Sequence, residues 1–136
     1  MISVIVTLLL SLAFSQEEIT YEISNKKINF YNNEQLRILA SEKCVLSKDG
    51  KSCKNFEFLK KVSIIKLGIP KEGGANPGSL ICEEQINGKI VMGYDSSQNQ
   101  ISFCKLANGT LIDNGTLSYY GHQNDGFVKK KRKVQR

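Results

Sequence analysis

The 136-residue sequence lacks several patterns that mark catalytic or nucleotide-binding proteins. It has no tryptophan, two prolines and one histidine, His122, which has no Asp or Cys neighbour in a spacing typical of catalysis. It contains neither a G-x-x-x-x-G-K-S/T loop nor a G-x-G-x-x-G fingerprint, which argues against a nucleotide site. Because no nucleophile, base or cofactor motif stands out, we predict that the protein is not an enzyme and uses no cofactor.

Positive charge is concentrated at one end of the chain. Lys and Arg number 19 against 13 Asp and Glu, a net charge of +6. Six cations in the last eight residues account for that net charge, so the rest of the chain is neutral. A neutral body argues against a folded basic surface that follows nucleic acid, and no specific nucleic acid is expected as a partner. The six cations are Lys129, Lys130, Lys131, Arg132, Lys133 and Arg136.

We predict that this basic tail, residues 122-136, is disordered, because a dense block of like charges repels itself. Its functional interpretation is attraction to an anionic polymer or surface of the cell envelope, worth about 1 kcal/mol per cation and weakened by salt. A tail without any partner is the alternative. The run from Lys129 to Val134 also matches a short nuclear-import signal, an interpretation that export would exclude.

The first fourteen residues carry no charged side chain and form an apolar run typical of a secretory signal peptide. The run is too short to cross a bilayer, which takes about 20 apolar residues. Ala13 and Ser15 supply the small residues expected for cleavage before Gln16. We therefore predict a signal peptide over residues 1-15 and a periplasmic or secreted mature protein without a transmembrane segment. Since no Lys or Arg precedes the run, a buried strand or helix is the alternative.

The even number of cysteines, four, is typical of disulfides in an exported chain. Three pairings are possible, and we favour Cys44 with Cys53 and Cys82 with Cys104. The first pair brackets an Asp-Gly turn that folds the chain back on itself, and the second would tie a helix to a strand. Each bridge is expected to contribute on the order of 3 kcal/mol. Zinc is the alternative, but no C-x₂-C pair is present and we predict no metal site.

The region over residues 16-72 is predicted to hold a strand followed by helices. Alternating apolar residues from Gln16 to about Phe30 indicate a half-buried strand. Helical spacing of apolar residues and an asparagine cap predict a helix from about Asn32 to Lys43. A second helix is expected after the cysteine-bracketed turn, although the β-branched segment 62–65 would suit a strand equally well.

Glycines and prolines between residues 68 and 78 predict an internal boundary, after which a helix begins. Asn76 is a suitable N-cap, and Pro77 fits the first helical position because its missing N–H is not needed there. Free N–H groups at this helix start could hold an anion, but Pro77 removes one donor, so a linker and cap are favoured. The motif under consideration is Asn76, Pro77, Gly78 and Ser79.

The remainder of this module, residues 73-121, reads as antiparallel strands. Segments 89–94 and 100–106 alternate on either side of a polar turn and predict a hairpin. Asn108-Gly109 and Asn114-Gly115 are further hairpin signals and predict strands up to Tyr120. The predicted fold class is therefore α+β: a short helix packed on a small antiparallel β-meander, with an N-terminal strand and helix region and disulfide stabilisation.

The pattern over residues 75-120 resembles a small family of exported bacterial domains of unknown function, some of which carry a haemolysin label. The resemblance covers about a third of the chain, and this sequence has Leu117 and two tyrosines where such domains often have a Trp and a further Cys. It implies an envelope or secreted location and a helix-plus-sheet module, and no activity. The matching residues are Asn76-Pro77-Gly78-Ser79, Cys82, Gly88, Cys104 and Asn108-Gly109.

Tyr119 and Tyr120 are the candidate contacts with a partner. On a strand, adjacent residues face opposite sides, so one of the two is expected in the core with Tyr94 and Phe103, and the other faces outward. We predict a non-enzymatic exported module that binds a protein or a cell-envelope polymer. The alternative is a small inhibitor of an extracytoplasmic hydrolase, presented on a rigid loop.

Overall fold

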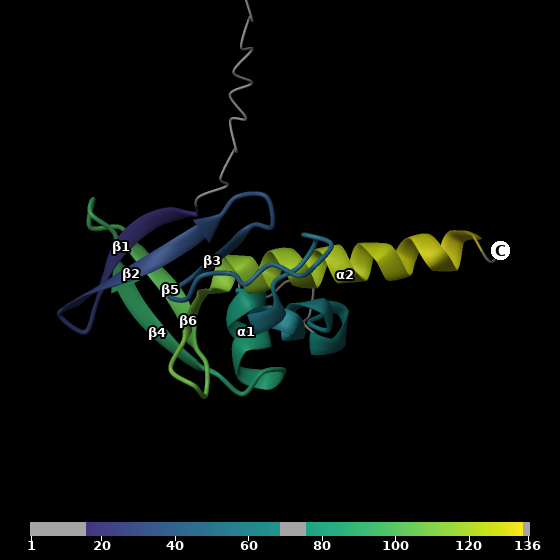
Figure 1. The fold of residues 1–136 in the computed structure, drawn as a ribbon. Coiled ribbons are helices and arrows are strands. Elements are labelled where there is room, and N and C mark those ends of the chain that lie inside the picture. The colour runs from purple at the N-terminus through teal and green to yellow at the C-terminus, as the bar shows by residue number, and fades with distance from the viewer. Residues whose placement is uncertain (1–15, 69–75, 135–136) are drawn as a thin grey trace, which may run out of the picture.

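A computed structural model describes residues 16–68 and 76–134, with side chains described as far as Gly126. Six antiparallel strands close into a barrel in the order β1-β2-β3-β6-β5-β4. Helices α1 and α2 and two 3-10 segments lie to one side of the barrel (Figure 1). The mixed helix and strand content agrees with the prediction, but the predicted meander is wrong because its strands belong to this closed barrel.

The first two strands form a hairpin. β1 (Glu17–Ile23) pairs along its whole length with β2 (Lys26–Asn33). Ser24 and Asn25 between them have φ of 53° and 63°, as a two-residue type I′ turn requires. The single strand predicted to about Phe30 is therefore two strands, because the apolar alternation continues across the turn.

The helix predicted from Asn32 to Lys43 is wrong. The chain turns after β2 and forms the short strand β3 (Ile38–Ala40), which pairs with the end of β2. Ile38 and Ala40 are both buried, so the period of two governs this segment. With only these two alternating residues, the strand leaves a weaker pattern in the sequence than the helical spacing of the apolar residues, and that spacing predicts a helix.

Two 3-10 segments follow the Cys44–Cys53 loop in place of the predicted second helix. They are η1 (Lys54–Lys60) and η2 (Ile65–Leu67), and segment 62–65 is not a strand. Phe56 has non-helical φ and ψ inside η1 and is buried. Phe56, Leu59 and Val62 are all buried, at the spacing of three residues that a 3-10 helix places on one face.

Helix α1 (Pro77–Glu84) begins where the sequence predicts. The side chain of Asn76 accepts a hydrogen bond from the Gly78 N–H at 2.9 Å, and Pro77 occupies the first turn. The hairpin of β4 (Lys89–Tyr94) and β5 (Gln100–Lys105) is also confirmed.

The largest difference from the sequence-based expectation follows β6 (Leu111–Asp113). The chain passes directly into α2 (Asn114–Val134), so the strand predicted up to Tyr120 is wrong. Asp113 caps this helix, since its Oδ1 accepts a hydrogen bond from the Gly115 N–H at 3.1 Å. The helical backbone also continues through most of residues 122-136, where disorder was expected.

The barrel interior holds one core cluster, and the space between barrel and helices holds another. Inside the barrel the rings of Phe30 and Phe103 lie 4.7 Å apart, and Tyr21 meets both edge-on. The second cluster surrounds the Cys82–Cys104 disulfide and joins residues from before and after the predicted internal boundary. Regions 16-72 and 73-121 therefore share one barrel and one outer core.

Candidate functional site

Two of the six junctions between neighbouring strands are held by a single registered pair, and we call these two junctions seams. β3 pairs with β6 in register only at Ala40 and Ile112, and β1 pairs with β4 only at Glu22 and Tyr94. The other strand pairs have at least three registered positions. Since strand order places the seams on opposite sides of the barrel, the barrel consists of two three-stranded sheets joined by one registered pair at each seam.

The seam between β3 and β6 opens into a groove of about 380 Å³. One wall comes from the end of β2, the following turn and β3, and the other from β6 and the first turns of α2. Thr116 partly fills the gap, because its Oγ1 accepts a hydrogen bond from the Leu39 N–H at 3.2 Å. The lining residues are Asn32, Glu34, Arg37, Leu39, Asp113, Gly115, Thr116 and Tyr119.

Arg37 and Tyr119 form the centre of this groove. The guanidinium carbon of Arg37 lies 5.1 Å from the centroid of the Tyr119 ring. Arg37 has a left-handed φ of 53°, which costs a non-glycine residue on the order of 1 kcal/mol. A guanidinium stacked on a ring still directs N–H groups outward from its edge, where they can donate to a ligand.

The turn that carries Arg37 is held at Leu36, the residue that precedes it. Asn33 Oδ1 accepts a hydrogen bond from the Leu36 N–H at 3.0 Å, and the Tyr120 hydroxyl donates to the Leu36 carbonyl at 2.6 Å. Burial raises the pKa of Tyr120, which keeps its hydroxyl a neutral donor. These bonds fix the strained turn, so Arg37 is positioned before any ligand arrives.

Asp113 adds a carboxyl group to the groove wall. Burial raises the pKa of Asp113, and its hydrogen bond from Gly115 offsets part of that rise. With Glu34 and Arg37, the groove presents acids, a cation, an amide and a hydroxyl within one hollow. Such a mixture can exchange hydrogen bonds with a ligand rich in hydroxyl groups.

Both predicted disulfides are confirmed. Cys44 and Cys53 are bonded with their Cα atoms 5.2 Å apart, and Cys82 and Cys104 with theirs 5.7 Å apart. A Cβ on Gly88 would lie 2.8 Å from the Cys82 sulfur, so this glycine leaves room for the inner bridge. The cysteines are structural, which leaves them out of the candidate site.

The predicted Asn76-Pro77-Gly78-Ser79 motif also has a structural role. It docks the start of α1 against the start of α2: Gly78 lies against the Asn114 backbone, and Asn114 Nδ2 donates to Ser79 Oγ at 3.2 Å. The same amide donates to Ser102 Oγ on β5 at 2.9 Å. The motif therefore joins α1, β5 and α2, and the groove lies elsewhere.

The remaining predicted residues lie on α2. Tyr119 and Tyr120 are both half-buried on this helix, while Tyr94, expected in the core, is 43% exposed. His122 is exposed. The backbone carrying Lys129, Lys130, Lys131, Arg132 and Lys133 is helical, and their side chains and Arg136 lie outside the described part. Their contact with an anionic polymer stays a prediction.

Sequence reasoning missed the contacts that hold α2 in place. The Asp125 carboxylate is buried and accepts hydrogen bonds from Ser63 Oγ and from the N–H groups of Ile64 and Ile65. Asn124 Nδ2 donates to the carbonyl of Leu59, near the end of η1, at 2.9 Å and to the carbonyl of Val62, just beyond η1, at 2.8 Å. These bonds anchor α2 to the 3-10 segments, and Tyr119 is thereby fixed opposite Arg37.

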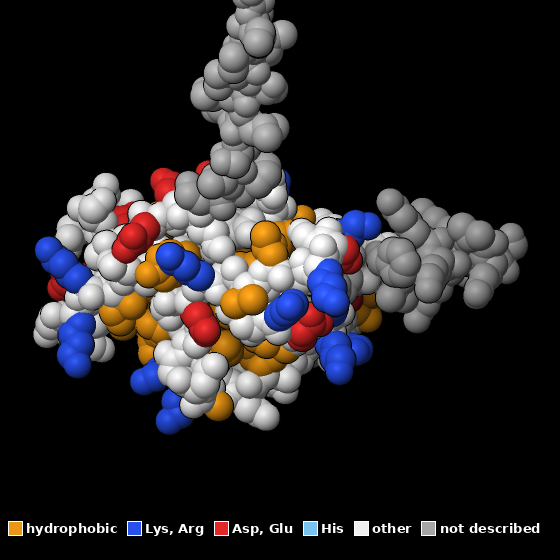
Figure 2. All heavy atoms as spheres, in the orientation of Figure 1, with side chains coloured by type: hydrophobic (Ala, Val, Ile, Leu, Met, Phe, Trp, Pro, Cys, Tyr) orange, Lys and Arg blue, Asp and Glu red, His pale blue; other side chains and the backbone are white. Residues whose placement is uncertain are grey.

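Over residues 16–68 and 76–134, no helix has the length and apolar composition needed for a membrane crossing. The same part of the chain holds no group of three or more acidic, His or Cys side chains arranged for a metal ion. Figure 2 shows Lys, Arg, Asp and Glu side chains scattered over one face without a large basic patch. No family model, curated protein or solved structure matches the chain.

Proposed function

We propose that this protein is an exported, non-enzymatic module that binds a polysaccharide of the cell envelope through the β3/β6 groove. The observation that carries the proposal is the Arg37–Tyr119 stack, held by a rigid turn inside a groove of hydrogen-bonding side chains. The Tyr119 ring supports the Arg37 guanidinium, whose N–H groups can bond the hydroxyls of a sugar together with the amide and carboxyl groups of the groove. The two disulfides support export, because such bonds persist in oxidising compartments.

The extent of the groove supports a polymer as the ligand. A second hollow of about 390 Å³ shares Asn32 and Glu34 with the first and continues past Gln35 towards Leu46. The two hollows together follow the end of β2 from α2 to the Cys44–Cys53 loop. A chain of several sugar units would fill this path better than a single small molecule.

Replacing Tyr119 with alanine tests the proposal. We expect Tyr119→Ala to weaken binding to the polysaccharide about tenfold, because it removes both the ring and the support of the Arg37 guanidinium. The measurement is depletion of the protein from solution by a panel of insoluble polysaccharides: cellulose, chitin and purified peptidoglycan. Tyr94→Ala is the matched control, since Tyr94 is an exposed tyrosine at the opposite seam.

Two results would contradict this function. Equal loss of binding in the Tyr119→Ala and Tyr94→Ala variants would mean that the β3/β6 groove is not the polysaccharide-binding site. Release of soluble sugars from any polysaccharide of the panel by the wild-type protein would show catalysis, and the non-enzymatic assignment would be wrong.

Inhibition of an extracytoplasmic hydrolase is the second candidate, favoured by the Cys44–Cys53 loop. Val45 and Leu46 are adjacent on this loop and 52% and 49% exposed, so together they present an apolar surface to a partner. The loop is rigid: besides the disulfide, Ser47 N–H donates to the Ser52 carbonyl at 2.9 Å, and Lys54 N–H to the Val45 carbonyl at 2.7 Å. A rigid loop enters a cleft at a low entropic cost.

Leu46→Ala separates this candidate from the first. If the loop inhibits a hydrolase, the wild-type protein at micromolar concentration slows at least one member of a panel of secreted proteases and glycosidases. Leu46→Ala is then expected to raise the inhibition constant about tenfold, because it empties the pocket that the leucine would fill. Tyr119→Ala serves as the control and should inhibit like the wild type. No change of rate across the panel would exclude inhibition.

A further inference from the structure

The β1/β4 seam leaves part of β1 without a strand neighbour. β1 pairs with β2 over all seven of its residues, but with β4 only at Glu22. β4 ends at Tyr94, and the following turn bonds within itself: Asp95 N–H donates to the Asn99 carbonyl at 3.0 Å. Within residues 16–68 and 76–134, the edge of β1 from Glu17 to Tyr21 therefore runs past the turn without a ladder partner.

The hairpin geometry tells which backbone groups face this edge. In a hairpin with a two-residue turn, the residues next to the turn, here Ile23 and Lys26, form a hydrogen-bonded pair. Bonding to the partner strand then recurs at every second residue. The N–H and C=O groups of Glu18 and Thr20 consequently point away from β2, towards the seam.

Space for another chain segment lies beside Thr20, at the inner end of this edge. A hollow of about 490 Å³ opens between β1 and the β4–β5 turn, lined among others by Thr20, Tyr94, Ser96 and Gln98. The exposed Tyr94 ring forms one side of this hollow. An extended peptide could lie along β1 here and pack a side chain on the ring.

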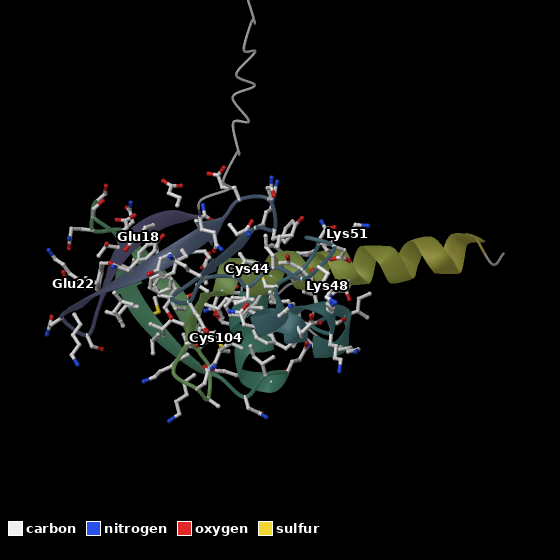
Figure 3. The ribbon with its side chains drawn as sticks, viewed as in Figure 1. Glu18, Glu22, Cys44, Lys48, Lys51 and Cys104 are labelled. Atoms are coloured by element: carbon white, nitrogen blue, oxygen red, sulfur yellow. A yellow bond between two sulfur atoms is a disulfide. The ribbon has the colours of Figure 1, made fainter. Side chains whose placement is uncertain are left out.

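The negative charge near the β1 edge favours a basic peptide as its ligand. Glu17, Glu18 and Glu22 are all exposed on β1, and hydrogen bonds from Asn99 lower the pKa of Asp95 in the neighbouring turn. Lys27, opposite Glu22 on β2, is the cation that lines the same hollow. Figure 3 shows Glu18 and Glu22 along β1, well apart from Lys48 and Lys51 of the disulfide loop. The negative excess favours a basic segment and disfavours pairing with the β1 edge of a second copy.

We propose that the free edge of β1 accepts an extended, lysine- or arginine-rich segment of a partner protein as an added strand. The backbone groups of Glu18 and Thr20 bond the backbone of that segment, as in other cases of strand addition. The glutamates of β1 attract its cations, and Tyr94 packs against one of its side chains. This surface lies at the seam opposite the groove that holds Arg37 and Tyr119.

The first experiment tests backbone pairing with the wild-type protein. The probe is the peptide acetyl-Lys-Val-Lys-Thr-Lys-Val-Lys-amide, titrated by calorimetry against the full mature chain. Its matched control has the same side chains but carries N-methyl groups at alternate residues, which remove the N–H donors. We expect the control to bind about tenfold more weakly, and we expect amide exchange at Glu18 and Thr20 to slow only with the unmodified peptide. Equal binding of both peptides, or unchanged exchange at these amides, would overturn the proposal.

The second experiment tests the charge. The double variant Glu18→Gln, Glu22→Gln is expected to bind the unmodified peptide about fivefold to tenfold more weakly and to lose most of the salt dependence of binding. The double variant Glu83→Gln, Glu84→Gln, which removes two exposed acids from α1 and from neither proposed binding surface, is the matched control and should bind like the wild type. If this control weakens binding as much as the first double variant, the interaction is general attraction by acidic residues and the proposed edge is wrong.

Discussion

The substitution Gly78→Ala is expected to lower the free energy of unfolding by at least about 3 kcal/mol. Gly78 is buried at the first turn of α1, and a Cβ at this position would lie 2.7 Å from the carbonyl carbon of Asn114. The obstacle is backbone at the start of α2 and cannot rotate aside as a side chain would. Relief would require α1 and α2 to separate, which breaks the bond between Ser79 and Asn114.

Urea unfolding followed by circular dichroism measures this effect. The matched control is Gly126→Ala, since a Cβ on Gly126 of α2 meets nothing within 4 Å. This control is expected to stabilise the protein by up to about 1 kcal/mol, because alanine favours the helix over glycine. A loss below about 1 kcal/mol in Gly78→Ala would mean that the helix junction yields, contrary to the packing described here.

Removal of the inner disulfide by the double change Cys82→Ala, Cys104→Ala is the second large effect. Loop-closure entropy alone amounts to about 3 kcal/mol for a bridge between residues 22 positions apart. Both cysteines are also completely buried, so the variant leaves a cavity in the core between the barrel and the helices. We expect a total loss of about 4 kcal/mol or more, enough to unfold much of the population at 37 °C.

The Cys44–Cys53 disulfide serves as the comparison for the Cys82–Cys104 disulfide. Cys44 and Cys53 are only 9 positions apart and close a surface loop, so the double change Cys44→Ala, Cys53→Ala is expected to cost about 2 to 3 kcal/mol. Thermal unfolding of both variants beside the wild type shows the order. A larger loss from the outer pair than from the inner pair would indicate that the surface loop, and not the α1–β5 junction, stabilises the fold.

Local signals made part of this structure predictable. The start of α1 follows from an Asn-Pro pair that suits an N-cap and the first helical position, and the β4–β5 hairpin follows from two alternating segments around a polar turn. The disulfide pairing follows from the same elements, because Cys82 lies on the predicted helix and Cys104 on the predicted strand. Each of these inferences needed only a few neighbouring residues.

The elements that the sequence did not predict depend on contacts between residues far apart in the chain. Asn114-Gly115 serves equally well as a hairpin turn or as a helix start, and the sequence nearby does not choose between them. The choice depends on Gly121, which lies close enough to Ile64 and Ile81 that a Cβ there would be 2.9 Å from each. Those contacts join segments far apart in the sequence, which local patterns cannot report.

The residues of the candidate site also divide into those that local sequence patterns indicate and those that only the folded chain brings together. Tyr119 and Tyr120 are candidate contacts in the sequence because one of two adjacent strand residues should face outward, whereas both lie half-buried on α2 and only Tyr119 lines the groove. Arg37 was missed, since it was assigned to a helix that does not form, and Asp113 was missed because it belonged to a predicted hairpin. Barrel closure brings these three residues into one groove, and closure is a property of the whole chain.

The narrow β3/β6 seam has a consequence for the timing of folding. Ser41 and Leu111, 70 positions apart, share two hydrogen bonds at this seam, and Thr116 on α2 adds a third between Leu39 and the helix. During synthesis the first three strands emerge without the strands that cover their apolar side. The polypeptide thus cannot reach its native topology until nearly all of it has left the ribosome. Such late closure would keep a nascent chain unfolded long enough to thread through a translocation channel.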